Sequence, residues 1–98
     1  MTQSALFIGN ESLLIQCATQ WRDRGYSVSA ILTRDPAIRD WAEAQGIRVA
    51  AQADTREPGD LKYDWLFSVA NLSLVPDALL TRAAKGAINF HDGPLPRG

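Results

Sequence analysis

Short, continuous apolar runs that stop at a glycine or a polar turn are the feature that most constrains the fold of this chain. Ala5-Leu6-Phe7-Ile8 ends at Gly9, a second run spans residues 64–70, and a third begins at residue 87. Such runs are typical of parallel strands buried on both faces, because a strand with one face in water alternates apolar and polar residues. The sequence therefore predicts strands at residues 5–8, 64–70 and 87–90 in a sheet covered by helices.

Between these runs, apolar residues recur with the period of a helix that lies on a sheet. The predicted helices begin at about residues 14, 36 and 76 and stop near residues 25, 46 and 86. Asp35 is a suitable N-cap for the second helix, and Gly46 is a suitable stop. In the third helix, Leu79, Leu80 and Ala83 are expected to face inward. Two further strands are expected, at residues 26–33 and 47–51.

This order of strands and helices predicts an α/β, Rossmann-like fold. Strands that alternate with helices form parallel pairs through right-handed crossovers, with the helices on the faces of the sheet. We expect a mostly parallel sheet of about five strands with helices on both faces. The 98 residues are enough for one hydrophobic core, so residues 1–98 are predicted to form one domain.

Charge and composition narrow the class of partner. The net charge is −1 and 46% of residues are hydrophobic, which favours neither a nucleic-acid-binding nor a membrane-surface protein. Cys17 is the one cysteine and His91 the one histidine, so an internal disulfide is excluded and no protein metal site is predicted. Cys17 is expected to lie in the core. The N-terminus resembles neither a signal peptide nor a membrane span, and we therefore predict a cytoplasmic protein.

The end of the last predicted strand carries the candidate catalytic residues, Asn89 and His91. Residues two apart in a strand face the same side, so both could act on one substrate atom. An Asn amide can donate to an oxyanion, and a His can exchange protons near neutral pH, which suits acyl transfer. From spacing alone, an ordinary strand-end histidine beside Asp92 is the simpler interpretation, and the surrounding motif has to decide.

Three stretches follow the carboxyl ends of predicted strands: residues 9–10, 70–73 and 89–93. In an open α/β sheet these ends share one edge, where ligands bind at a change of strand direction. A nicotinamide cofactor is disfavoured there. The turn after residue 8 has one glycine where a dinucleotide fingerprint needs three, and Glu11 would meet the pyrophosphate.

The motif Asn89-Phe90-His91 followed by Leu95-Pro96 resembles the N-terminal catalytic domain of formyltetrahydrofolate-dependent formyltransferases. The family's signature, Asn-x-His-x-Ser-Leu-Leu-Pro, is matched in register, with Gly93 and Pro94 in place of Ser and Leu. Residues 69–76 are similar to the family's strand-loop segment that contacts the folate. Within the family, the variant around His91 looks most like formyltransferase-like domains of multidomain peptide or polyketide synthases.

The resemblance implies formyl transfer from 10-formyltetrahydrofolate, the cosubstrate, to an amine-bearing acceptor. Asn89 would stabilise the oxyanion, and His91 would assist it or move the proton. The residues implied in cofactor binding are Ala70, Asn71, Leu72, Ser73 and Val75.

The family's third catalytic residue, an Asp, has no counterpart in these 98 residues, and Asp92 should face the opposite side of the strand from His91. The resemblance therefore implies a fragment truncated at its C-terminal end that is weak or inactive in isolation. The alternative hypothesis is a non-catalytic, Rossmann-like binding or docking module with a relic active site. In either case residues 87–90 should form an exposed apolar strand edge, open to self-association.

Overall fold

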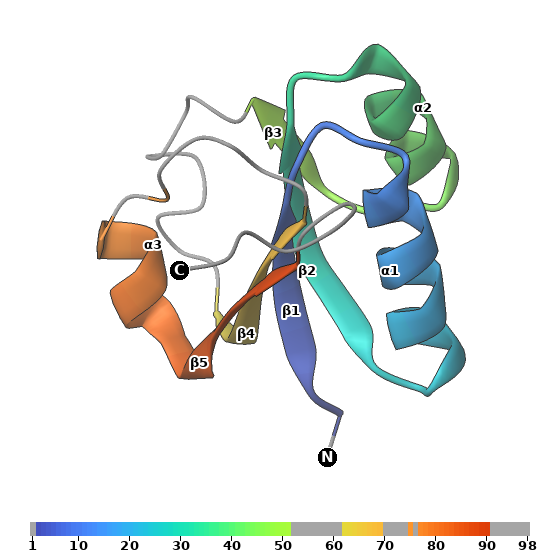
Figure 1. The fold of residues 1–98 in the computed structure, drawn as a ribbon. Helices are drawn as coiled ribbons and strands as arrows, with labels where there is room; N and C mark the ends of the chain where they lie inside the picture. Colours follow the sequence, from blue (N-terminus) through green and yellow to red (C-terminus); the bar gives the residue numbers. More distant parts are fainter. Residues whose placement is uncertain (1, 52–61, 70–74, 76, 91–98) are drawn as a thin grey trace.

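The computed structural model describes residues 2–51, 62–69, 75 and 77–90. The elements in chain order are β1 (Ser4–Ile8), α1 (Leu13–Asp23), β2 (Ser27–Thr33), α2 (Pro36–Ala44), β3 (Val49–Ala51), β4 (Tyr63–Val69), α3 (Asp77–Arg82) and β5 (Ala83–Phe90). In this part of the chain, five strands form one sheet in the order β3-β2-β1-β4-β5. Every neighbouring pair is parallel (Figure 1). The predicted α/β, Rossmann-like fold is confirmed.

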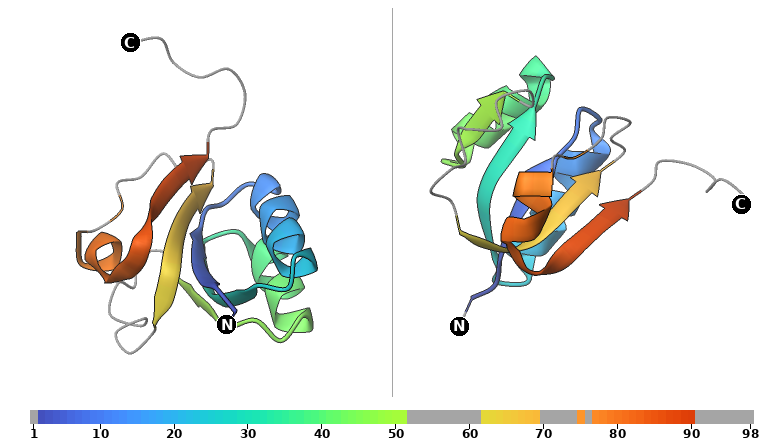
Figure 2. Two further views of the ribbon diagram at one scale, coloured as in Figure 1. Left: turned by 90° about the horizontal axis from the view of Figure 1, so that it is seen from below. Right: turned by 90° about the vertical axis from the view of Figure 1, so that its left-hand side faces the viewer.

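Helices cover both faces of the sheet, as predicted. Helices α1 and α2 pack on one face, here called the α1 face, and α3 packs on the other, here called the α3 face (Figure 2). Strand β1 lies at the centre, and its side chains are buried alternately on both faces. Ala5 and Phe7 join the core under α1 and α2, whereas Leu6 and Ile8 join the core that includes Leu79 of α3. This double burial explains why β1 is a continuous apolar run.

The local sequence features that predicted the first two helices, a capping residue and two terminal glycines, have the expected roles in the structure. The Asp35 side chain accepts a hydrogen bond from the Ala37 amide at 2.9 Å and so caps α2. Gly25 and Gly46 follow the two helices with φ angles of 89° and 73°, a conformation that glycine adopts without strain. Ile47, predicted as strand, instead donates its amide to the Ala42 carbonyl oxygen at 2.9 Å and closes α2. The third strand therefore begins at Val49 rather than at Ile47.

The boundary between α3 and β5 differs from the prediction. Helix α3 ends at Arg82, and Lys85 and Gly86 belong to β5 rather than closing the helix. Pairing with β4 accounts for the difference, because Ala83 already pairs with Tyr63 and the ladder resumes at Trp65 and Gly86 after an irregularity. Leu79 is buried as expected and Ala83 packs against the same core, but Leu80 is 37% exposed.

The three tryptophans lie at the margins of the core under α1 and α2, where each is half-buried and packs against it. The Trp21 indole nitrogen donates to the Ser27 carbonyl oxygen at 2.7 Å. The Trp65 indole nitrogen donates to Gln3 Oε1 at the same distance. These bonds satisfy the polar end of each ring while its apolar part remains packed.

Tyr63 connects β4 to α3. Its hydroxyl donates to the Leu79 carbonyl oxygen at 2.5 Å, and 3% of the residue is exposed. Burial raises the pKa of Tyr63 above its ordinary value, and the nearby Arg82 charge lowers it in part. The neutral phenol is therefore the form that holds α3 on the sheet.

Tyr63→Phe should lower the free energy of unfolding by about 1 kcal/mol, because it removes this buried hydrogen bond without changing the ring. Urea unfolding followed by circular dichroism measures the change. Tyr26→Phe, which removes the same oxygen from a half-buried ring beside Trp21, is the matched control. Equal losses in the two variants would contradict a specific role for the bond to Leu79.

Candidate functional site at the carboxyl edge of the sheet

All the strands of the described sheet are parallel, so their carboxyl ends meet at one edge. After β1, the chain adds β2 and β3 on one side of β1. It then returns and adds β4 and β5 on the other side, so the direction in which strands are added reverses at β1. Open α/β sheets commonly bind ligands at such a reversal, at the carboxyl ends of the two central strands, which are β1 and β4 here. Gly9 follows β1 there, and Val69 ends β4.

Gly9 lies directly against the end of β4. A Cβ atom added to Gly9 would lie 2.3 Å from the Val69 carbonyl oxygen and 3.2 Å from Leu14 Cδ1. The first distance is too short for a side chain, and this neighbour is main chain that cannot rotate away; the second is tight and would require the Leu14 side chain to shift slightly. Glycine is therefore required because two backbones approach closely, the role that glycine commonly has at such turns.

Asn10 ties the turn after β1 to the end of β2. Its side-chain oxygen accepts hydrogen bonds from the Arg34 amide at 2.6 Å and from the Thr33 hydroxyl at 3.2 Å. The Thr33 side-chain oxygen in turn accepts a hydrogen bond at 3.1 Å from the amide of Asp35, the N-cap of α2. Thr33 is fully buried, and this chain of hydrogen bonds holds the turn after β1 and the end of β2 in one arrangement.

Asn89 is exposed near the carboxyl end of β5, opposite Ser68 of β4. The pleat places their side chains on the α3 face, since Phe67 and Val69, which alternate with Ser68, are buried in the core on the α1 face. Val75 is half-buried against the core of the α3 face. The structure therefore brings two predicted site residues, Asn89 and Val75, to the same face. The other predicted residues lie outside the described part of the chain: His91, Ala70, Asn71, Leu72 and Ser73.

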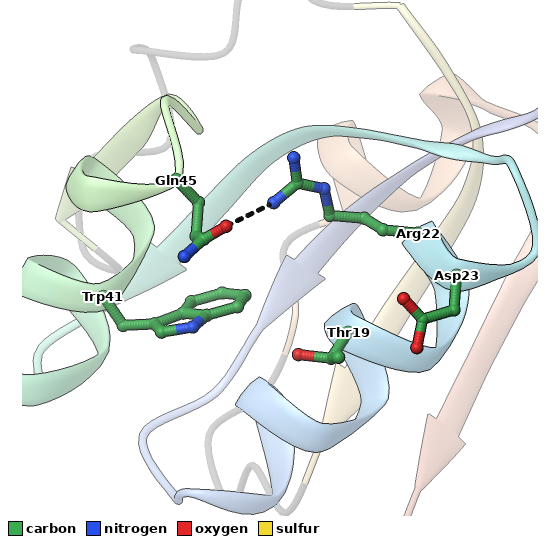
Figure 3. A pocket seen from close by; sticks show the side chains of 5 residues that line it. All are labelled: Thr19, Arg22, Asp23, Trp41 and Gln45. Carbon is green, nitrogen blue, oxygen red and sulfur yellow. Dashed lines mark hydrogen bonds between the residues drawn. The ribbon is translucent and has the colours of Figure 1, made fainter.

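A hollow of about 410 Å³ lies between α1 and α2 (Figure 3). It is lined by Thr19, Arg22, Asp23, Trp41 and Gln45, and an Arg22 guanidinium nitrogen donates to Gln45 Oε1 at 3.2 Å. These residues belong to or adjoin the C-terminal halves of the helices, which run antiparallel to the strands. The hollow therefore lies toward the amino edge of the sheet and away from the candidate site.

A second concavity, the aromatic groove, lies on the α1 face beside α1 and over β4 and β5. Its volume is about 300 Å³, and its lining residues are Phe7, Cys17, Gln20, Trp21, Arg24, Tyr26, Phe67, Ile88 and Phe90. Phe67 is at its centre, with ring centroids 5.1 Å from Trp21 and 5.5 Å from Phe90 in edge-to-face contacts. Trp21 lies on the apolar stripe of α1, and this pattern did not predict the groove. The groove could have been predicted from the handedness of the crossovers. A right-handed crossover from β4 to β5 places α3 on the opposite face and, in the described part of the chain, leaves the α1 face of these two strands without a helix.

No protein-family model matches this chain. Among the described residues, no three His, Cys, Asp or Glu side chains cluster in a way that could hold a metal ion. No helix in that part of the chain is long and apolar enough to cross a bilayer.

Gly9→Ala should lower the free energy of unfolding by about 2–3 kcal/mol, because the added methyl group overlaps the Val69 carbonyl and forces β1 and β4 apart. Urea unfolding gives the value. Gly46→Asn is the control, because that site has open space and a φ of 73° that Asn tolerates. We expect the control to be nearly neutral, and a neutral Gly9→Ala would disprove the close approach.

Cys17 is half-buried in the wall of the groove, and burial raises the pKa of its thiol above the ordinary 9.0. Iodoacetamide should therefore alkylate Cys17 more slowly in the folded protein than in urea at the same pH, because the thiolate is the reactive form.

The same raised pKa makes the free energy of unfolding depend on pH. The thiol of Cys17 loses its proton at a lower pH in the unfolded chain than in the folded one, so its contribution to stability should be fully present below about pH 9 and be lost as the pH rises through the folded-state pKa. Cys17→Ala should reduce this loss of stability at high pH, measured by urea unfolding. An unchanged loss would show that the Cys17 thiol is not its source.

Proposed function

We propose that this chain takes part in transferring a formyl group from 10-formyltetrahydrofolate to an amine acceptor. The observation that carries the proposal is the position of Asn89. It is exposed at the carboxyl end of β5, next to the end of β4, on the edge where the β1 turn also opens. The motif that places His91 two residues further on is the sequence support.

The chemistry asks little of the protein beyond placement. The acceptor amine attacks the formyl carbon, a new carbon–nitrogen bond forms, and the bond from that carbon to the folate nitrogen breaks. Negative charge develops on the formyl oxygen, and the Asn89 amide can donate a hydrogen bond to it, an interaction typically worth about 3–4 kcal/mol of barrier. In this proposal His91 moves the proton from the amine to the departing nitrogen.

The described surroundings of Asn89 suit a reduced folate in chemical character. Val75 offers an apolar, half-buried side chain on the same face as the Asn89 amide. A flat heterocycle is commonly held by apolar contacts together with a few polar groups that set its orientation. Ala70, Asn71, Leu72 and Ser73 complete the proposed folate contacts on sequence grounds.

A non-catalytic docking module is the second candidate. The specific observation in its favour is the exposure of Ile88 and Phe90, which are 42% and 37% accessible. Large apolar side chains gathered at a sheet edge are typical of surfaces that bind another polypeptide.

Calorimetric titration with a stable 10-formyltetrahydrofolate analogue tests the proposal. Binding should occur, survive His91→Ala, and be lost in Leu72→Asp, because a charge in the folate loop opposes an apolar contact. Binding is the readout because it tests the proposed folate contacts directly.

Leu80→Asp is the matched control for Leu72→Asp. It introduces the same charge at an exposed leucine of α3, and binding should be retained. Circular dichroism establishes that each variant is folded. Failure of the folded wild-type chain to bind the analogue would reject the folate proposal and favour the docking module.

A further inference from the structure

Strand β5 ends the described sheet on one side, with no neighbour beyond it among the residues that the structure describes. Among these residues, no strand pairs with the outer row of main-chain donors and acceptors of β5. Edge strands are commonly protected by proline, several charges or a twist away from partners. From residue 86 to residue 90, β5 contains neither a proline nor a charged side chain.

This part of β5 is also its regular part. The ladder with β4 is continuous from Gly86 opposite Trp65 to Phe90 opposite Val69, and the register is irregular before it. Ile88 is thus the central residue of the five-residue segment Gly86 to Phe90, which pairs continuously with β4 and which a new strand could join; Gly86 has a φ of 145°, a conformation that glycine adopts without strain. Ile88 and Phe90 are exposed on the α1 face, where both line the aromatic groove.

We propose that two copies of this chain associate through antiparallel pairing of their β5 strands, with Ile88 on the twofold axis. In an antiparallel pair, residues directly opposite one another face the same side of the sheet. For identical strands, one residue must therefore oppose its own copy. Placing Ile88 there uses the whole regular segment and sets Phe90 of each copy opposite Gly86 of the other.

The surface above Gly86 suits a phenyl ring. A Cβ added to Gly86 would lie 3.5 Å from Trp65 Cζ3, so the indole forms the floor of the space that glycine leaves open. A ring placed opposite a strand glycine covers its exposed backbone, and the pairing of an aromatic residue with a cross-strand glycine is a known stabilising arrangement. Phe90 of the second copy would pack on Trp65 in this register.

Other registers use these features less well. With Asn89 on the axis, Phe90 would oppose Ile88, and Gly86 would fall outside the described overlap. With Ala87 on the axis, the pairing would extend into the irregular segment before Gly86. The net charge of −1 adds little repulsion between copies.

The dimer proposal does not depend on the folate proposal. Ile88 and Phe90 occupy the α1 face of β5, whereas Asn89 occupies the α3 face. Loss of one activity therefore leaves the other measurable.

Sedimentation velocity over a range of concentrations of the whole chain is the first test. We expect a reversible dimer, weakened by about tenfold or more in Phe90→Ala and abolished in Ile88→Lys. Leu80→Lys is the control, since it places the same charge on an exposed leucine of α3, and its dimer should be unchanged. A wild-type monomer at every concentration, or a dimer indifferent to both β5 variants, overturns the proposal.

Disulfide trapping in a Cys17→Ser background tests the register and remains informative if Ile88→Lys fails to fold. Ile88→Cys should form a cross-linked dimer on mild oxidation, because its two copies would face one another across the axis. Ala87→Cys is the neighbouring control, and its two copies would be diagonal, beyond disulfide reach. Faster cross-linking of Ala87→Cys than of Ile88→Cys overturns the proposed register.

Discussion

The contact between Gly9 and the Val69 carbonyl sets the distance between the ends of β1 and β4, because no side chain fits between them. This contact lies at the reversal of strand order, where open α/β sheets commonly bind ligands. On the other side of β1, the Asn10 side chain accepts hydrogen bonds from Thr33 and Arg34 and so connects the turn after β1 to the end of β2. Main-chain packing and side-chain hydrogen bonds thus hold the three central strand ends together without using the residues proposed for chemistry.

The helices cover the two faces of the sheet unequally, and this explains why Ile88 and Phe90 are exposed. Right-handed crossovers put α1 and α2 on one face while the chain moves from β1 to β3, and put α3 on the other face when it moves from β4 to β5. Within the described chain, the α1 face of β4 and β5 therefore has no helix of its own. Phe67, Ile88 and Phe90 meet there, and the aromatic groove is a result of the topology. The proposed catalytic amide and the proposed dimer surface occupy opposite faces of the same strand.

The candidate site was predictable to the extent that it follows from alternation along a strand. Asn89 was placed at the carboxyl end of β5 from the sequence, and the structure confirms this position. The aromatic groove was not predicted, because Trp21 lies on a helical apolar stripe whether its outer side is covered or open. A stripe shows which side of a helix faces the sheet. Coverage depends on elements that are distant in the sequence.

The sequence by itself determined the elements governed by local forces: the apolar runs of buried strands, the Asp35 cap, and the glycines that end α1 and α2. These depend on hydrogen bonds and backbone conformations within a few residues of each other. Tertiary structure decided where α3 gives way to β5, since pairing with β4 draws Lys85 and Gly86 into a strand although they resemble a helix end. It also decided the exposure of Ile88 and Phe90, because the direction of each crossover determines which face receives a helix.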